Sequence, residues 1–80
     1  MSDESQKITI SFGKILKQKR IEAGVSQEQL AFNIKSHPTH ISRLENGHKQ
    51  PTLSMIFKLC NELNIRPSVL ISELEKLNSL

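Results

Sequence analysis

Apolar residues recur along this chain at spacings of three and four positions, in five short segments separated by turn-forming residues. This spacing places apolar side chains on one face of a helix, and no segment alternates for long enough to form a strand. The sequence predicts one all-α domain without a linker or an internal repeat, with helices over about 12–23, 27–35, 38–46, 53–64 and 67–77. The inward stripes of the last two helices are Leu53, Ile56, Leu59, Cys60 and Leu63, and Leu70, Ile71, Leu74 and Leu77.

Residues with known capping preferences mark the starts of these helices. Ser11, Ser26 and Thr52 suit the N-cap position, because a hydroxyl there accepts a hydrogen bond from a free first-turn N–H. Ser26 and Gln29 together match a capping box. Pro38 suits a first turn, since its ring has no N–H to satisfy and its φ is already helical.

The composition excludes several classes of protein. The longest apolar run is three residues, far below the roughly 20 that a membrane span needs. Residues 1–6 are polar and acidic, unlike a signal peptide, and the single cysteine cannot form an internal disulfide. We expect a soluble, cytoplasmic protein with no membrane partner, a lead-in over residues 1–10 and one domain over residues 11–80.

The positive charge lies in one part of the chain. The formal net charge is +3, but residues 11–50 carry seven Lys and Arg against three Glu, a net of +4. Residues 1–10 carry a net of −1, and residues 51–80 are neutral. A local excess of this kind suits a polyanion such as nucleic acid, although a total of +3 is also typical of a solvated surface.

The two short helices over residues 26–46 carry the most specific pattern. Residues 26–31 read Ser-Gln-Glu-Gln-Leu-Ala, and residues 41–47 read Ile-Ser-Arg-Leu-Glu-Asn-Gly, with a proline and a leucine following. From about residue 12 to residue 70, the chain resembles the phage repressor and Cro (XRE-type) helix-turn-helix family. The resemblance implies a lambda-repressor-like, five-helix DNA-binding domain whose second and third helices form the helix-turn-helix. The chain departs from the family pattern at Lys35, where the family usually has glycine, and at Pro38.

The third helix is the expected recognition helix, because the second helix of such a motif presents its outer face to base edges in the major groove. Ile41 and Leu44 face the core, which leaves the polar positions outward. Arg43 could donate two hydrogen bonds to guanine, and Thr39 offers a hydroxyl and a methyl group to thymine. The candidate base-reading residues are Pro38, Thr39, His40, Ser42 and Arg43.

The resemblance also implies phosphate contacts and one internal ion pair. Gln27 lies in the first turn of the second helix, where its amide and the free N–H groups can meet a phosphate oxygen. The candidate phosphate-binding residues are Gln27, Lys35, Asn46, His48 and Lys49, with Lys14 and Lys17 as further candidates or as solubilising lysines. Arg20 and Glu45 match family residues that form a partly buried ion pair, so we expect both to be structural.

No pattern in the sequence indicates an enzyme. Gly13-Lys14 lacks the rest of a phosphate-binding loop, and no carboxylate pair or nucleophile–base arrangement is evident. A zinc site would need a fourth ligand, and Cys60 lies on an apolar stripe, so we expect no metal. The histidines at 37, 40 and 48 are better explained as DNA-facing or solvated. We expect no catalytic activity, no cofactor and no small-molecule ligand.

The last two helices carry more apolar residues than one small core needs. We expect the excess at a dimer interface, where the candidates are Met55, Phe57, Val69, Leu77 and Leu80. The sequence thus predicts a homodimeric, sequence-specific regulator of transcription that binds an inverted repeat in double-stranded DNA. It is similar to the stand-alone controller proteins of restriction–modification systems and to small phage regulators. The alternative is an antitoxin-type interaction module that neutralises a partner toxin and regulates its own synthesis.

Overall fold

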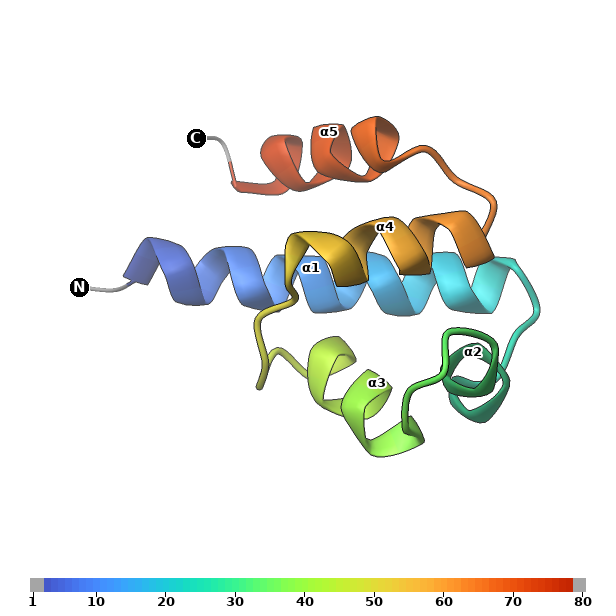
Figure 1. Ribbon diagram of the computed structural model, residues 1–80. Coiled ribbons are helices and arrows are strands. Elements are labelled where there is room, and N and C mark those ends of the chain that lie inside the picture. Colours follow the sequence, from blue (N-terminus) through green and yellow to red (C-terminus); the bar gives the residue numbers. More distant parts are fainter. Residues whose placement is uncertain (1–2, 79–80) are drawn as a thin grey trace.

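Five helices make up the part of the chain that the computed structural model describes, residues 3–78 (Figure 1). They are α1 (Asp3–Glu22), α2 (Gln27–Asn33), α3 (Pro38–Glu45), α4 (Leu53–Glu62) and α5 (Pro67–Asn78). Neither a strand nor a bridge occurs within these residues. The all-α class and the five helices that the hydrophobic pattern predicts are therefore confirmed.

Helix α1 is the central element of the fold. It packs against α3 and α5, while α2 packs against α3 and α4 (Figure 1). The side chains between the helices form one core of thirteen apolar residues. They are Phe12, Ile15, Leu16, Leu30, Ala31, Ile34, Ile41, Leu44, Ile56, Leu59, Cys60, Leu63 and Leu70. Helix α1 supplies Phe12, Ile15 and Leu16 to this core from the middle of its length, between the helices that it contacts.

The expected start of the first helix is wrong. Helix α1 begins at Asp3, so residues 3–10 of the expected lead-in are helical, and Met1 and Ser2 lie outside the described residues. Ser11 is not an N-cap, and its hydroxyl instead lies 3.4 Å from Oδ1 of Asn78 at the end of α5. The β-branched residues before Phe12 have modest helix propensity, but Ile8 is half-buried where it lines a pocket with Phe12, Ile56 and Leu74, and this burial favours the helix.

The predicted caps of α2 and α4 are present. The Ser26 hydroxyl accepts from the Gln29 N–H at 3.0 Å, and the Thr52 hydroxyl accepts from the Met55 N–H at 3.1 Å. The predicted capping box is wrong in its second half, because the Gln29 amide donates to Asn33 at 3.1 Å and not to Ser26. The Ser26 hydroxyl is thus the only one of the two side chains that caps the first turn of α2. The Gln29 side chain instead bonds to Asn33 on the exposed side of the same helix.

The turn between α2 and α3 contains Lys35 in a left-handed conformation, with φ of 58°. The Lys35 N–H bonds to the Phe32 carbonyl at 3.1 Å, and the Ser36 N–H bonds to the Ala31 carbonyl at 2.7 Å. These two bonds close the C-terminus of α2 in the way that glycine usually does. Lysine therefore replaces the family's usual glycine without a change in the type of turn, at a conformational cost.

Replacing Lys35 with glycine should raise the free energy of unfolding by about 0.5–1 kcal/mol, because glycine has no Cβ to strain at this φ. Urea denaturation followed by circular dichroism measures the change. Lys58→Gly is the matched control, since Lys58 is an exposed lysine inside α4, and there glycine should cost about 1 kcal/mol. Equal destabilisation by both substitutions would contradict this account of the turn.

The predicted inward stripes of the last two helices are wrong at three positions. Leu53 is 75% exposed, Ile71 43% and Leu77 58%. Leu53 is the first residue of α4 and lies beside Phe57, one turn later, at the edge of the buried face. Ile71 follows the buried Leu70 and is turned from it by about 100° around the helix. These side chains are left on the surface of a single chain.

Helices α1 and α3 lie close together at Gly13. A Cβ atom at this position would lie 2.5 Å from the carbonyl oxygen of Leu44 and 2.6 Å from that of Glu45. Both contacted atoms belong to backbone, which cannot rotate away as a flexible side chain can. A glycine is therefore needed in the middle of α1 for the recognition helix to be held at this distance.

Candidate nucleic-acid interface

Helices α2 and α3 pack against each other across the turn of residues 34–37. Ile41 and Leu44 of α3 are fully buried, which directs the opposite side of this helix outward. Pro38 is the first residue of α3, as the sequence predicts. The local sequence therefore produces a short amphipathic helix that is anchored on one side and polar on the other.

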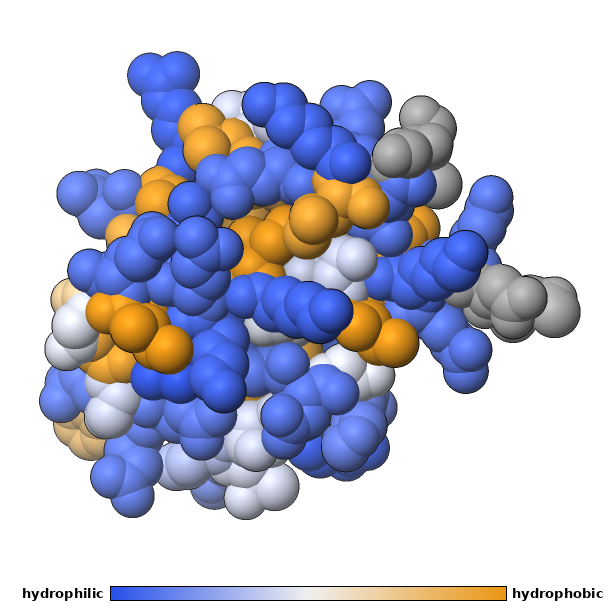
Figure 2. Space-filling view, turned by 180° about the vertical axis from the view of Figure 1, so that it is seen from behind, coloured by the Kyte–Doolittle hydropathy of each residue, from blue (hydrophilic) through white to orange (hydrophobic). Residues whose placement is uncertain are grey.

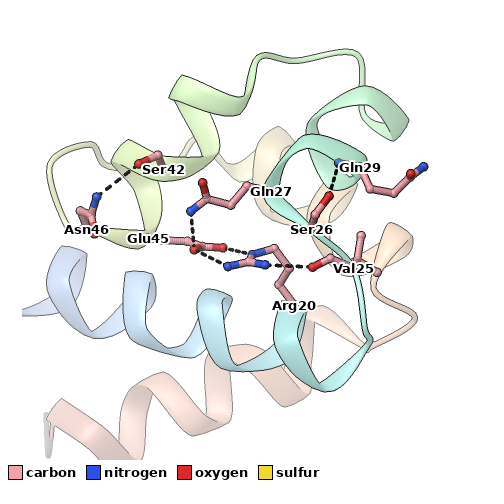
Figure 3. Close-up of polar contacts among 8 residues, drawn as sticks. All are labelled: Arg20, Val25, Ser26, Gln27, Gln29, Ser42, Glu45 and Asn46. Atoms are coloured by element: carbon pink, nitrogen blue, oxygen red, sulfur yellow. Dashed lines mark hydrogen bonds and ion pairs between the residues drawn. The ribbon is translucent and has the colours of Figure 1, made fainter.

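The candidate base-reading residues lie on this outer side, but they differ in exposure. Pro38, Thr39 and Arg43 are exposed. Thr39 and Arg43 are four residues apart and therefore share one face of the helix. His40 and Ser42 are half-buried. The Ser42 hydroxyl accepts a hydrogen bond from the Asn46 amide at 3.3 Å (Figure 3), so this serine also helps to orient the residue after the helix.

A shallow groove on the surface joins the start of α3 to the loop that follows it. The groove is lined by His37, Pro38, Thr39, His40, Arg43 and Lys49. His37, which the sequence leaves as either DNA-facing or solvated, is exposed and lines this groove directly before the helix-starting proline. The structure thus brings all the candidate base-reading residues except Ser42 together with Lys49, one of the candidate phosphate ligands.

The imidazole of His40 lies among positively charged groups. Its Nδ1 is 2.9 Å from the Ser36 hydroxyl. Partial burial, followed by the charges of Lys49 and Arg43 and by His37, lowers the pKa of His40 below its ordinary value of 6.5. The groups that shift this pKa through their charge are all cationic, so the groove is a region of positive potential. An anion placed there would favour the protonated imidazole.

A measurable pH dependence follows from the lowered pKa of His40. The unfolded chain binds a proton more readily than the folded chain, so stability is complete above pH 6.5 and decreases as the pH falls below it. Replacing His40 with glutamine should flatten the decrease in the free energy of unfolding between about pH 7 and pH 5. Urea titrations at several pH values test this, with His48→Gln in the exposed loop as control. If His40→Gln left the pH dependence of the free energy of unfolding unchanged, the lowered pKa of His40 would be contradicted.

The loop between α3 and α4 carries three of the candidate phosphate-binding residues. Asn46, His48 and Lys49 are all exposed. The loop is fixed by Gly47, which has φ of 74° and lies so close to Ile10 that a Cβ atom would be 3.0 Å from that side chain. The helical extension of α1 that the sequence analysis missed therefore supports the loop. Lys35 is exposed in the turn before α3.

Gln27 lies at the first position of α2 but points toward the protein. Its amide nitrogen donates to Oε1 of Glu45 at 2.9 Å (Figure 3). An amide nitrogen carries a second hydrogen, and the Gln27 side chain is half-buried, so one donor remains beside the N-terminus of α2. A phosphate contact from Gln27 therefore stays a prediction. The structure adds that the Gln27 side chain also has a partner inside the protein, Glu45.

Arg20 and Glu45 form a buried ion pair between the ends of α1 and α3 (Figure 3). The Arg20 guanidinium contacts both carboxylate oxygens, with Nη2 at 3.0 Å from Oε1, and its Nη1 donates to the Val25 carbonyl at 2.9 Å. The side chains are 11% and 1% exposed. Hydrogen bonding to Glu45 raises the pKa of Arg20 above its ordinary value. This cluster joins three helices behind the outward face of α3.

Candidate dimer residues lie on α4 and α5. Phe57, Val69 and Leu77 are 60%, 44% and 58% exposed, as an interface requires. Met55 is half-buried and packs against the core, and Leu80 lies outside the described residues. Leu53, which the sequence analysis places in the core, is exposed one turn before Phe57, and their spacing of four residues is the signal that could have paired them.

A buried ion pair and an apolar core hold a short helix with a polar outer face, preceded by a second short helix and a tight turn. This arrangement defines a helix-turn-helix DNA-binding domain. The sequence profile of the helix-turn-helix family matches residues 16–70, and the chain belongs to that family. The resemblance to XRE-type proteins is confirmed.

Several of the similar proteins are control or controller proteins of restriction–modification systems. The chain is 35% identical over 65 residues to control protein C.BamHI from Bacillus amyloliquefaciens, covering 80% of each. It is 39% identical over 70 residues to control protein C.MunI from Mycoplasma sp, covering 86% of this chain and 95% of the relative. The crystal structure of the controller protein C.AhdI from Aeromonas hydrophila superimposes with a TM-score of 0.74 at 34% identity, covering 78% of this chain and 94% of C.AhdI. The chain is thus a helix-turn-helix regulator of the restriction–modification controller type.

None of the helices within residues 3–78 is both long enough and apolar enough to cross a membrane.

Proposed function

We propose that this protein regulates transcription by binding, as a homodimer, to an inverted repeat in double-stranded DNA in the cytoplasm. The observation that carries the proposal is the outward face of α3, where Thr39 and Arg43 are exposed side by side while Ile41 and Leu44 anchor the helix. A helix presented in this way fits the major groove of B-DNA. The similarity to named control proteins supports a regulatory role.

Base recognition is assigned first to Arg43 and Thr39. A guanidinium can donate to O6 and N7 of guanine, and threonine can contact the methyl group of thymine. Pro38, His40 and Ser42 complete the reading surface, with Pro38 contributing apolar contact because it has no donor. Each good base contact is worth about 1–3 kcal/mol of discrimination against a wrong base.

Phosphate contacts are assigned to the residues that flank the reading surface. The exposed loop residues Asn46, His48 and Lys49 lie after α3, and Lys35 and Gln27 lie before it. Such contacts fix the register of the protein on the duplex without reading sequence. They also make binding weaken as salt rises, because each contact releases counterions from the DNA.

Dimer formation is assigned to the exposed apolar residues of α4 and α5. Leu53 and Phe57 form an apolar pair on α4, and Val69, Ile71 and Leu77 are exposed on α5. These side chains lie on helices other than α2 and α3, so two chains can join while both recognition helices remain free. A dimer then presents two recognition helices to successive major grooves, roughly 34 Å apart.

Replacing Arg43 with alanine should weaken binding to the operator about tenfold to a hundredfold and relax the preference at one base pair in each half-site. Fluorescence anisotropy with operator and random duplexes at fixed salt measures both effects. Lys49→Ala is the comparison. Loss of a phosphate contact should weaken binding to both duplexes alike and lower the slope of log affinity against log salt concentration by about 1. A loss for Arg43→Ala that is equal on operator and random DNA would exclude base reading by this residue.

A further inference from the structure

One side of α1 makes no contribution to the core. Lys7, Ile10, Lys14, Lys17 and Ile21 are all exposed, with Ile10 at 47% and Ile21 at 58%. They follow one another at spacings of three, four, three and four residues, which places them in one row along the helix. We call this row the outer face of α1. It is about 21 Å long, since fourteen residue steps rise by about 1.5 Å each.

The outer face of α1 meets other surfaces at its N-terminal end, where Ile10 lies against Gly47 and lines a pocket with His48 and Lys49, and where Lys7 and Ile10 line a pocket with Leu77. Helix α1 contacts α3 at Gly13 and contacts α5 through Lys19, whose ammonium lies 2.9 Å from Glu73. Neither residue belongs to the row. In Figure 1, α4 lies in front of α1. Figure 2 shows the opposite side of the molecule, where hydrophobic residues form separate clusters among hydrophilic ones.

The three lysines of this face lack carboxylate partners among the described side chains. The ion pairs in that part of the chain involve Lys19 and Arg20 instead. Glu22, the nearest acidic residue at the end of the helix, accepts a hydrogen bond from Gln18 and lies 3.9 Å from Lys19. The face therefore combines a net positive charge with two exposed β-branched apolar side chains.

We propose that the outer face of α1 binds an acidic, amphipathic helix of a partner protein. Apolar side chains of that helix would cover Ile10 and Ile21, and carboxylates would meet the lysines between them, as in helix pairs with a 3–4 repeat. The inference goes beyond DNA binding, because it gives the regulator a second surface whose partner is a protein.

Charge complementarity favours an acidic helix over two other possible occupants of this face, a second copy of the chain and a DNA backbone. A second copy of the same face would set Lys14 against Lys14 in an antiparallel pair, and each lysine against its counterpart in a parallel pair. Like charges in such contacts are destabilising. A DNA backbone would satisfy the lysines but would leave Ile10 and Ile21 against phosphates. An acidic helix with apolar residues at the same spacing satisfies both kinds of side chain.

The test uses the full chain and a synthetic helical peptide of about 20 residues with leucine and glutamate arranged to match the row. Fluorescence anisotropy measures affinity, and amide chemical shifts of the labelled protein locate the site. We expect saturable binding and shifts centred on the outer face of α1. A scrambled peptide of the same composition should bind at least tenfold more weakly. Equal binding of the scrambled peptide, shifts centred elsewhere or no binding at about 1 mM peptide would overturn the proposal.

Variants separate the proposed surface from general charge. Lys14→Glu combined with Lys17→Glu should weaken peptide binding about tenfold at low salt, whereas Lys58→Glu combined with Lys76→Glu, on α4 and α5, should change it less than threefold. Ile21→Ser should weaken the peptide and leave operator affinity within twofold of the original. Circular dichroism verifies that each variant folds. Equal effects of the two charge-reversed pairs would contradict the proposal, and operator binding reports on DNA recognition independently.

Discussion

Replacing Glu45 with alanine should lower the free energy of unfolding by about 3–5 kcal/mol, because the buried guanidinium of Arg20 loses its partner. The carboxylate is 1% exposed on its side chain and accepts hydrogen bonds from both Arg20 and Gln27. A small domain has a total stability of only about 5–15 kcal/mol, so the variant should be largely unfolded at 37 °C. Urea denaturation monitored by circular dichroism measures the loss.

Two comparisons make this prediction specific to the ion pair. Glu75→Ala removes an exposed carboxylate of α5 and should change stability by less than about 0.5 kcal/mol. Exchanging the two charges, with Arg20→Glu and Glu45→Arg in one chain, should recover part of the stability that either single reversal loses. A loss below about 1 kcal/mol for Glu45→Ala, or no recovery in the exchanged chain, would show that the pair contributes little.

Replacing Gly13 with alanine should destabilise the fold by about 3 kcal/mol, although alanine is the better helix former. The added Cβ would lie 2.5 Å and 2.6 Å from two carbonyl oxygens of α3. Relief requires α1 and α3 to separate, which also disturbs the Arg20–Glu45 contact about two turns further along α1. Overpacking of this kind costs about 1–3 kcal/mol, and the contacted backbone places the effect at the upper end.

The neighbouring position provides the control for Gly13→Ala. Lys14 is exposed on the same helix, and Lys14→Ala should change the free energy of unfolding by less than about 0.5 kcal/mol. If Gly13→Ala instead stabilised the protein by the roughly 1 kcal/mol expected from helix propensity alone, the close approach of the two helices would be wrong.

The sequence predicts α2, α3 and α4 well because their ends are determined locally. Ser26 and Thr52 favour a helix start by accepting from a backbone N–H, Pro38 favours one through its fixed φ, and the structure places the starts there. The start of α1 could not be predicted in this way. Ile8, Thr9 and Ile10 have modest helix propensity, and Ser11 has the chemistry of a cap, so the helical state of these residues depends on packing against distant parts of the chain.

Parts of the site could not be predicted from local sequence patterns either. The polar row on α3 follows from the burial of Ile41 and Leu44, which the helical spacing indicates. The bond from Gln27 to Glu45 joins residues 18 positions apart, and no spacing within one helix reveals it. The exposure of Leu53 depends in the same way on which side of α4 the other helices cover, which sequence periodicity does not specify.

The central claim is that two copies of this chain read one inverted repeat through their third helices. The most direct test is equilibrium binding of the full chain to duplex DNA from upstream of its own gene, in competition with random duplex at physiological salt. The account predicts a preference of about a thousandfold or more, with two chains bound to each inverted repeat and a steep decrease in affinity with salt. Equal affinity for both duplexes, together with a stoichiometric protein partner that copurifies, would contradict it and favour an antitoxin-type role.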